Sequence, residues 1–230
     1  INPGDWAVDE PIIVNGNLII SPNTTLSFAN DSYMIVKGAL SAIGKNTSPI
    51  SFRAKNDKWR GIYVLNAKSK SKLRYVNISD VLALETGLLK LTGAVNFYRS
   101  DIEMENIKIE NIDAEDGINI IESLFSLNSL LVTNAISDGI DFDFSNGDIT
   151  HSNFINIGGD ALDFSGSNAL VSHVNVKNAR DKAISVGENS QVDINLSYFK
   201  DIGVGVASKD GSKVKLSQST VEDYKLHARI

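Results

Sequence analysis

Aspartates recur in this sequence at intervals that would let their carboxylates act together. Asp138, Asp141 and Asp143 lie within six residues, and Asp160 and Asp163 repeat the first two of them 22 residues later. Carboxylate oxygens are ligands that Ca²⁺ prefers, and a pair of carboxyl groups also forms the general acid and base that cleave sugar chains. The spacing therefore predicts either an oxygen-rich cation site or acid–base chemistry.

The interval of about 22 residues runs through much of the chain and predicts the elements that carry these aspartates. Small residues recur at Gly117, Gly139, Ala161, Ala183 and Gly205. Between them apolar and polar residues alternate, as where Ile140, Phe142 and Phe144 enclose two aspartates, which is the period of a strand with one buried face. Short strands, polar corners and a repeat of this length predict an all-β fold, a single-stranded parallel β-helix.

Asparagine is unusually frequent, and the predicted fold gives it a place. Its side chain tolerates the left-handed backbone that tight corners need, and its amide can hydrogen-bond the equivalent residue on the next coil. We therefore expect ladders of asparagines at the corners.

The composition limits the domain count and the partners. A chain of 230 residues predicts one domain over 1–230, with irregular N-terminal coils in 1–91 and regular coils in 92–230, as part of a longer protein. We expect a short helical insertion or a strand over Val81–Leu91. A net charge of −6 argues against nucleic acid, and no apolar run is long enough for membrane insertion. The absence of cysteine excludes thiolate chemistry.

Strand parity predicts the first candidate site. Asp141 and Asp143 should point away from the core, with Asp163 one coil above Asp141, and outward positions on neighbouring coils are about 4.8 Å apart. Like charges this close repel one another unless a cation joins them, so these three residues are the predicted ligands of Ca²⁺. The alternative is a solvated acidic stripe that keeps the long sheet soluble.

A second column has Asp116, Asp138, Asp160 and Lys182 at equivalent positions, where Lys182 would neutralise Asp160 at a half-buried corner. If the chain is an enzyme, the predicted catalytic residues are Asp138, Asp141, Asp160, Asp163 and Lys182. The predicted substrate-binding residues are Asp143, Glu188, Lys209 and Asp210. His151 and His173 are also one repeat apart, and we expect them to form a polar corner ladder, continued by Asn195, or a metal-binding pair.

Particular segments resemble a known group of proteins. Gly38-Ala-Leu-Ser-Ala-Ile-Gly, Pro49-Ile-Ser-Phe and Trp59-Arg-Gly-Ile are similar to the first coils of right-handed parallel β-helix, pectin-lyase-like regions of secreted bacterial proteins. Asp181-Lys-Ala-Ile-Ser-Val-Gly-Glu-Asn-Ser and Val206-Ala-Ser-Lys-Asp-Gly-Ser resemble later coils of a subset that accompanies CotH-type domains. The resemblance implies a right-handed coil and an extracellular, cell-surface or periplasmic bacterial protein, and it implies little about activity.

A second resemblance concerns catalysis. Polygalacturonases share this fold, and Ser137-Asp138-Gly-Ile-Asp141 and Gly159-Asp160-Ala161 are similar in layout to their Asn-Thr-Asp and Gly-Asp-Asp motifs. Ala161 stands where that family has the second aspartate of the pair, and Asp181-Lys182-Ala183 stands in place of its Gly-His-Gly. The family's Arg-Ile-Lys motif is not found. Without the aspartate pair that family's acid and base are not both assembled, which argues against this activity.

These observations favour a secreted or cell-surface, non-catalytic module that binds a polysaccharide or a protein partner along its strand face with Ca²⁺. The alternative is a polysaccharide lyase, glycoside hydrolase or epimerase that acts on an acidic glycan. A further alternative is a structural spacer or fibre-forming rod, with end-to-end self-association or a missing C-terminal cap, because the last coil shows no amphipathic cap.

Overall fold

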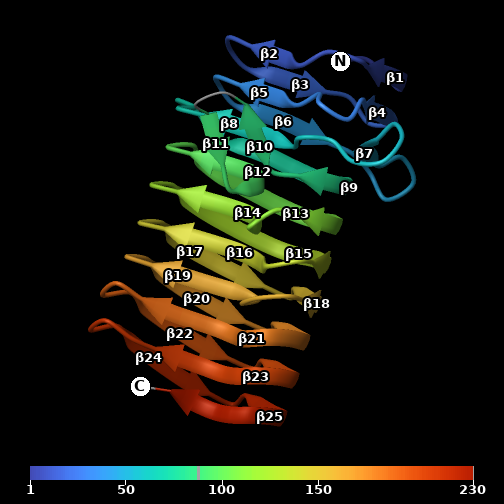
Figure 1. Cartoon of the computed structure of the whole chain (residues 1–230). Coiled ribbons are helices and arrows are strands. Elements are labelled where there is room, and N and C mark those ends of the chain that lie inside the picture. Colours follow the sequence, from blue (N-terminus) through green and yellow to red (C-terminus); the bar gives the residue numbers. More distant parts are fainter. Residues whose placement is uncertain (87–88, 230) are drawn as a thin grey trace.

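Parallel strands stack coil upon coil along one axis in the structure, a computed structural model that describes residues 1–86 and 89–229 (Figure 1). Ile140 pairs with Leu162, 22 residues later, and Leu162 pairs with Ile184 after a further 22. The chain is an all-β, right-handed parallel β-helix, which confirms the predicted fold class and the handedness that the resemblance implied. None of the described segments forms a helix long and apolar enough to cross a membrane.

Each coil contributes strands to three faces. The first face, called the strand face below, contains β2 (Ile12–Val14), β5 (Met34–Val36), β8 (Ile62–Leu65), β12 (Gly93–Tyr98), β14 (Asp116–Ile121), β16 (Asp138–Asp143), β19 (Leu162–Ser165) and the C-terminal parts of β21 (Asn175–Gly187), β23 (Tyr198–Ser208) and β25 (Thr220–Arg229). The second face contains β3 (Leu18–Ile20), β6 (Leu40–Ile43), β17 (Asn146–Thr150), β20 (Asn168–Ser172), β22 (Gln191–Asn195), β24 (Lys213–Ser217) and the N-terminal parts of β9 (Ser71–Leu82), β13 (Ile102–Asp113) and β15 (Leu124–Ala135). The third face contains β1 (Gly4–Val8), β4 (Thr24–Phe28), β7 (Ile50–Ala54), β18 (Asn153–Ile157) and the remaining parts of the long strands.

Apolar and serine side chains fill the space between the three faces. Phe142 stacks on Phe164 at a ring-centroid distance of 4.6 Å and lies 4.4 Å from Phe125. Buried serines form a second internal column, in which the N–H of Ser123 donates to Ser145 Oγ at 3.1 Å and the N–H of Ser145 donates to Ser167 Oγ at 2.9 Å. This column satisfies backbone groups at a bend that apolar side chains would leave unpaired.

The corners carry the expected asparagines. Asn111, Asn134, Asn156 and Asn178 all adopt a left-handed backbone with φ of 58–59°. The amides of Asn134, Asn156 and Asn178 each donate to the Oδ1 of the asparagine one coil earlier, at distances of 3.3, 3.0 and 2.9 Å. The predicted asparagine ladder is therefore confirmed at this corner.

Two local expectations differ from the structure. Phe144 does not continue the buried alternation of β16: its φ is 50° and it is 61% exposed, because the strand ends at Asp143 and the chain turns. A helix over Val81–Leu91 is wrong for the described part of that segment, where β10 (Leu84–Thr86) and β11 (Leu89–Leu91) form an antiparallel hairpin. Leu84 packs on Tyr63, which lies outside the main core, so the hairpin covers an apolar patch of the strand face. Residues 87–88 lie outside the described residues.

Candidate functional site

Three aspartates and a lysine occupy one column at the start of successive strands of the strand face. Asp116 pairs in register with Asp138. The N–H of Asp160 donates to Asp138 Oδ1 at 2.8 Å, and the N–H of Lys182 donates to Asp160 Oδ1 at 2.9 Å. Each of these two carboxylates therefore accepts a hydrogen bond from the backbone of the next coil, at the partly buried corner that the sequence predicts.

Lys182 ends this acidic column. Its Nζ lies 3.1 Å from both carboxylate oxygens of Asp160 and 2.5 Å from Asp181 Oδ2. The side chains of Lys182 and Asp160 are only 17% and 7% exposed, so this ion pair is largely shielded from water. The pairing predicted from sequence is present.

A second column lies three residues further along the chain in each coil. Asn119, Asp141, Asp163 and Ser185 pair in register on successive coils and share the outward side of the strand face. The amide of Asn119 donates to Asp141 Oδ2 at 3.1 Å and to Asp143 Oδ2 at 3.4 Å. The outward parity predicted for Asp141, Asp143 and Asp163 is therefore present, and Asn119 bridges two of these carboxyl groups.

This second column also contains polar atoms without partners. Within the described residues, the buried side-chain atoms that lack a hydrogen-bond partner are Asn119 Oδ1, Asp163 Oδ1 and Ser185 Oγ. Asn119 is 2% exposed and Ser185 is fully buried. A buried polar atom without a partner costs about 1–3 kcal/mol. Three such atoms in one column make this part of the strand face locally unfavourable in the absence of further hydrogen bonds.

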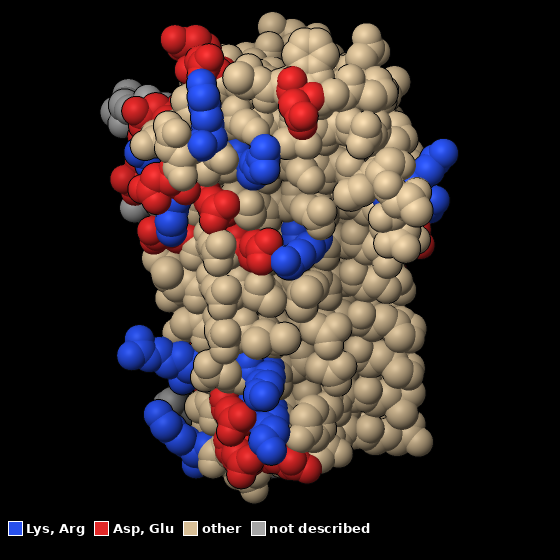
Figure 2. Space-filling model, turned by 90° about the vertical axis from the view of Figure 1, so that its right-hand side faces the viewer, with Lys and Arg blue, Asp and Glu red and all other residues tan. Residues whose placement is uncertain are grey.

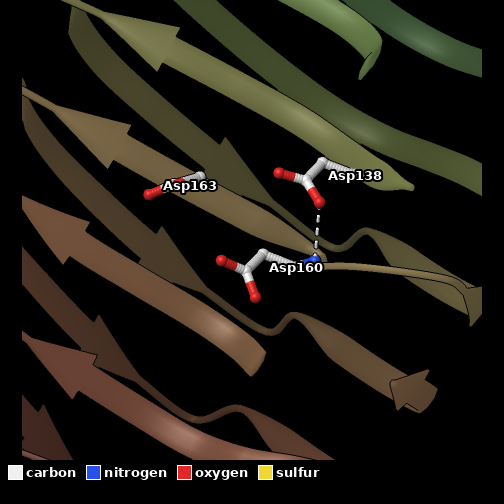
Figure 3. Close-up of side chains that lie close together, drawn as sticks. All are labelled: Asp138, Asp160 and Asp163. Carbon is white, nitrogen blue, oxygen red and sulfur yellow. Dashed lines mark hydrogen bonds between the residues drawn. The ribbon is translucent and has the colours of Figure 1, made fainter. Parts of the chain in front are cut away.

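The carboxylates that lie closest together come from both columns. Asp138, Asp160 and Asp163 each place an oxygen within 4.8 Å of the others, and Figure 3 shows the three side chains around a common space. This group, called the carboxylate cluster below, could hold a metal ion. It shares only Asp163 with the predicted ligand set, and the amide of Asn119 donates to the other two members, Asp141 and Asp143.

Burial changes the protonation of these groups. Burial raises the pKa of Asp141 to about 9, and repulsion from Asp143 acts in the same direction. Burial also raises the pKa of Asp116 to about 7 and that of Asp160 to about 6, where Lys182 acts in the opposite direction. Burial is also the main cause of the raised pKa values of Asp138 and Asp143. Asp141, Asp143 and Asp163 are partly exposed, so the solvated stripe stays an alternative for these three residues.

The predicted substrate-binding residues lie along the far edge of the same face. Asp143 pairs with Ser165, and Ser165 pairs with Gly187 one coil later. Glu188 and Asp210 occupy left-handed corner positions with φ of 56° and 53°, and Glu188, Lys209 and Asp210 are exposed. Glu188 contributes to the raised pKa of Asp143, so the edge is acidic, but these residues are not part of the carboxylate cluster.

The two histidines lie at another corner, which closes the second face. His151 and His173 stack with ring centroids 4.6 Å apart, and Ser172 Oγ lies 2.9 Å from His173 Nδ1. Asn195 does not continue their column, because it pairs in register with Ser172. The two histidines therefore stack on each other at this corner and are not part of the carboxylate cluster.

Two grooves run along the corner that precedes the acidic column. One of about 300 Å³ is lined by Arg60, Asp113 and Glu115 among others, and one of about 700 Å³ by Arg180, Asp201 and Lys225 among others. Figure 2 shows one side of the β-helix, on which charged side chains gather over the N-terminal and C-terminal coils and leave the coils between them almost uncharged. Neither groove includes a member of the carboxylate cluster in its lining.

Asn119 and Ser185 are site residues that the sequence analysis did not single out. Both occupy the position of Asp141 in its repeat, in Asp116-Gly-Ile-Asn-Ile and Lys182-Ala-Ile-Ser-Val. Aligning the repeats by register rather than by residue type would have found them. The assembled site offers oxygens for a hard cation, and donors and acceptors for hydroxyl groups.

No protein-family model and no curated protein matches this sequence. Among solved structures the chain is similar to Pantoea stewartii WceF, described as a glycan biofilm modifying enzyme with a bacteriophage tailspike-like parallel β-helix fold, at 10% identity and a TM-score of 0.48, over 94% of this chain and 33% of that one. It is also similar to the catalytic domain of a GH87 α-1,3-glucanase, at 9% identity and a TM-score of 0.35, over 100% of this chain and 63% of that one. The A-module of the mannuronan C-5 epimerase AlgE6 of Azotobacter vinelandii matches at 11% identity and a TM-score of 0.30, over 100% of this chain and 86% of that one.

The chain thus spans a third of the length of the first of these proteins and under two thirds of the second. At a sequence identity of about 10%, these similarities concern the fold alone. The chemistry of the candidate site therefore follows from the residues of this chain. The resemblance to coils that accompany CotH-type domains stays a prediction.

Proposed function

We propose that this chain binds a polysaccharide along the strand face, as a secreted or cell-surface bacterial module. The observation that carries the proposal is the outward column of Asn119, Asp141, Asp163 and Ser185, in which the carboxyl groups of Asp141 and Asp163 are partly exposed. From Asn119 to Ser185 the column crosses three coil steps, about 14 Å at the spacing of parallel strands. An extended chain of sugar hydroxyls can meet such a periodic row of donors and acceptors.

The side chains of the column favour a glycan over a protein partner. Protein interfaces centre on buried aromatic and apolar anchors, whereas this column consists of an amide, carboxyl groups and a hydroxyl. A divalent cation such as Ca²⁺ on the same face would offset the carboxylates and bridge them to glycan oxygens. Such a cation would also let the face accept an acidic glycan, which the carboxylates alone would repel.

Calorimetry against a panel of neutral, acidic and amino-containing oligosaccharides, with Ca²⁺ present, tests the proposal. We expect at least one class to bind, and Asp141→Asn and Asp163→Asn each to weaken that binding about tenfold. Asn175→Ala, an exposed residue of the third face, is the matched control and should leave binding unchanged. Glycan binding that is unchanged in both site variants, or no binding across the panel, would contradict the proposal.

A second candidate is an enzyme that cleaves or epimerises the bound glycan. It is favoured by the difference in proton affinity between Asp141, with a pKa raised to about 9, and Asp160, with a pKa of about 6. One carboxyl group is then protonated and the other largely ionised near pH 7, which is how acid and base roles are divided between carboxyls. Incubation of the same glycans with the protein, followed by product analysis, tests this. Turnover that persists in Asp141→Asn and in Asp160→Asn would remove these two residues from the reaction.

A further inference from the structure

We propose that the larger groove, at the corner between the third face and the strand face, is a second saccharide site that takes a neutral sugar. This groove of about 700 Å³, called the corner groove below, follows five successive coils from Ala135 to Tyr224. At the spacing of parallel strands this is a length of about 19 Å, enough for several sugar rings in a row. The inference goes beyond the proposed function, because the outward column of the strand face lies outside the lining of the groove.

The asparagine ladder is interrupted inside the corner groove. Up to Asn178 each amide donates to the residue one coil earlier, and the first of them, Asn111, donates to Asp80 Oδ1 at 2.9 Å. The next position of the ladder is Asp201, which has the same left-handed backbone with φ of 55°. A carboxylate has no N–H to donate, so Asn178 Oδ1 lacks the hydrogen bond that completes every earlier step.

Asp201 also receives no hydrogen bond from the coil that follows it. Its neighbour there is Asp223, a second carboxylate, which Lys200 Nζ approaches at 3.3 Å. Asp201 itself is exposed and takes part in none of the hydrogen bonds or ion pairs that side chains form within the described residues. When a chain follows one local rule over several coils and departs from it at a groove, the departure marks a candidate functional position. The amide oxygen of Asn178 and the Asp201 carboxylate are thus two neighbouring acceptors without a donor.

Two cations of the corner groove carry donors that the protein itself does not use. Arg180 and Lys225 are exposed, and neither forms an ion pair or a side-chain hydrogen bond with any residue that the structure describes. Arg180 follows Asn178 by two residues, so it lies beside the interrupted step of the ladder. Gly158 and Gly203 hold its position on the coils before and after it, so its neighbours in that column have no side chains.

This combination of groups suits a neutral sugar. A hydroxyl group both donates and accepts, so neighbouring hydroxyls of one ring can donate to the Asp201 carboxylate and accept from the Arg180 guanidinium. An acidic sugar would meet the unpaired carboxylate, and an amino sugar would meet the unpaired guanidinium. The aliphatic residues of the lining are at most 5% exposed, so the groove lacks the apolar anchors that many peptides use. Tyr224, which is 46% exposed, adds an aromatic side chain at the last coil.

Calorimetry of the whole chain with neutral hexose oligosaccharides, in the absence of Ca²⁺, tests the site. We expect saturable binding that is weakened about tenfold or more in Arg180→Gln and in Asp201→Asn. Lys177→Gln, which removes an exposed cation of the same strand outside the groove, and Asp193→Asn, at an exposed carboxylate of the second face, are the matched controls and should bind as the wild-type protein does. Binding that is unchanged in both groove variants, or tighter binding of an acidic oligosaccharide that is lost in Arg180→Gln, would overturn the inference.

Asp201→Asn also separates a ligand site from a purely structural corner. The amide that it introduces would donate to Asn178 Oδ1 and complete the ladder. We therefore expect the melting temperature of this variant to rise by about 2 °C or more while its sugar binding falls. A melting temperature that is unchanged or lower would overturn the interpretation of Asp201 as a step of the ladder given up for a ligand.

The strand-face variants keep this inference apart from the proposed function. Binding that is lost in Arg180→Gln but retained in Asp141→Asn and in Asp163→Asn would leave the corner groove standing and overturn the strand-face proposal. The opposite pattern would overturn the corner groove and leave the strand-face proposal standing. A wild-type protein that binds acidic but no neutral oligosaccharides would also overturn the corner groove alone.

Discussion

The ammonium group of Lys182 lies 3.1 Å from both carboxylate oxygens of Asp160, the residue one coil before it in the same column. This pair ends a run of stacked aspartates that begins at Asp116. Because both side chains are largely shielded, the carboxylate depends on this lysine for its charge compensation. The pair therefore links the stability of the β-helix to the electrostatics of the candidate site.

Replacing Lys182 by methionine should destabilise the fold by about 3 kcal/mol near pH 8, because it leaves the Asp160 carboxylate buried without its partner. Protonation of Asp160 relieves this cost, so the loss should be smaller at pH 5. Urea unfolding at the two pH values measures both. Lys200→Met, which removes an ion pair with Asp223 at the surface, is the control and should cost much less. An equal loss of unfolding free energy in Lys182→Met at both pH values would contradict this account.

Stability should fall as the pH rises from 6 to 9. Burial raises the pKa of Asp141 to about 9 and that of Asp116 to about 7, so the folded chain binds these protons more tightly than the unfolded chain does. Their contribution is complete at low pH and is lost as the pH passes through the folded values. Thermal melts at constant ionic strength should show the melting temperature falling by several degrees, and the fall should be smaller in Asp141→Asn. An unchanged or rising melting temperature over this range would contradict the raised pKa values.

The free energy of unfolding lost when a buried serine is replaced by alanine should depend on whether its hydroxyl is hydrogen-bonded. Ser145 Oγ accepts the N–H of Ser123 at 3.1 Å and lies 2.9 Å from the carbonyl oxygen of Asp143, so Ser145→Ala should cost about 1–3 kcal/mol. Ser185 is equally buried but its hydroxyl has no partner, so Ser185→Ala should be close to neutral. Urea unfolding of the two variants in the absence of ligand makes the comparison. Equal losses would contradict the assignment of an internal serine column.

The aromatic stack should contribute strongly to stability. Phe164 is fully buried against Phe142, and Phe164→Ala should cost about 3–5 kcal/mol through lost burial and the cavity left behind. Phe144, at 61% exposure on the adjoining corner, is the matched control, and its replacement by alanine should cost less than about 1 kcal/mol. Urea denaturation of the two variants measures the difference. If both substitutions cost the same, the stack does not hold the coils together.

The repeat alone determined the fold class and the coil length. A strict interval between the small residues, with alternation of period 2, leaves few architectures, and corners built from asparagine agree with the observed ladder at Asn111, Asn134, Asn156 and Asn178. Parity placed Asp141 and Asp163 outward, and the column that pairs Lys182 with Asp160 was also predicted. The end of β16 was not predicted, because Phe144 continues the apolar alternation in the sequence although the chain turns at this residue.

The tertiary structure decided which carboxylates meet. Straight columns suggested Asp141, Asp143 and Asp163, whereas the cluster joins Asp138 and Asp160 to Asp163 across two columns. Periodicity fixes which way a side chain points but carries no information on diagonal distances, on burial, or on which polar atoms lack partners. Those depend on how neighbouring coils stack and on which side chains shield one another from water, and both exist only in the folded chain.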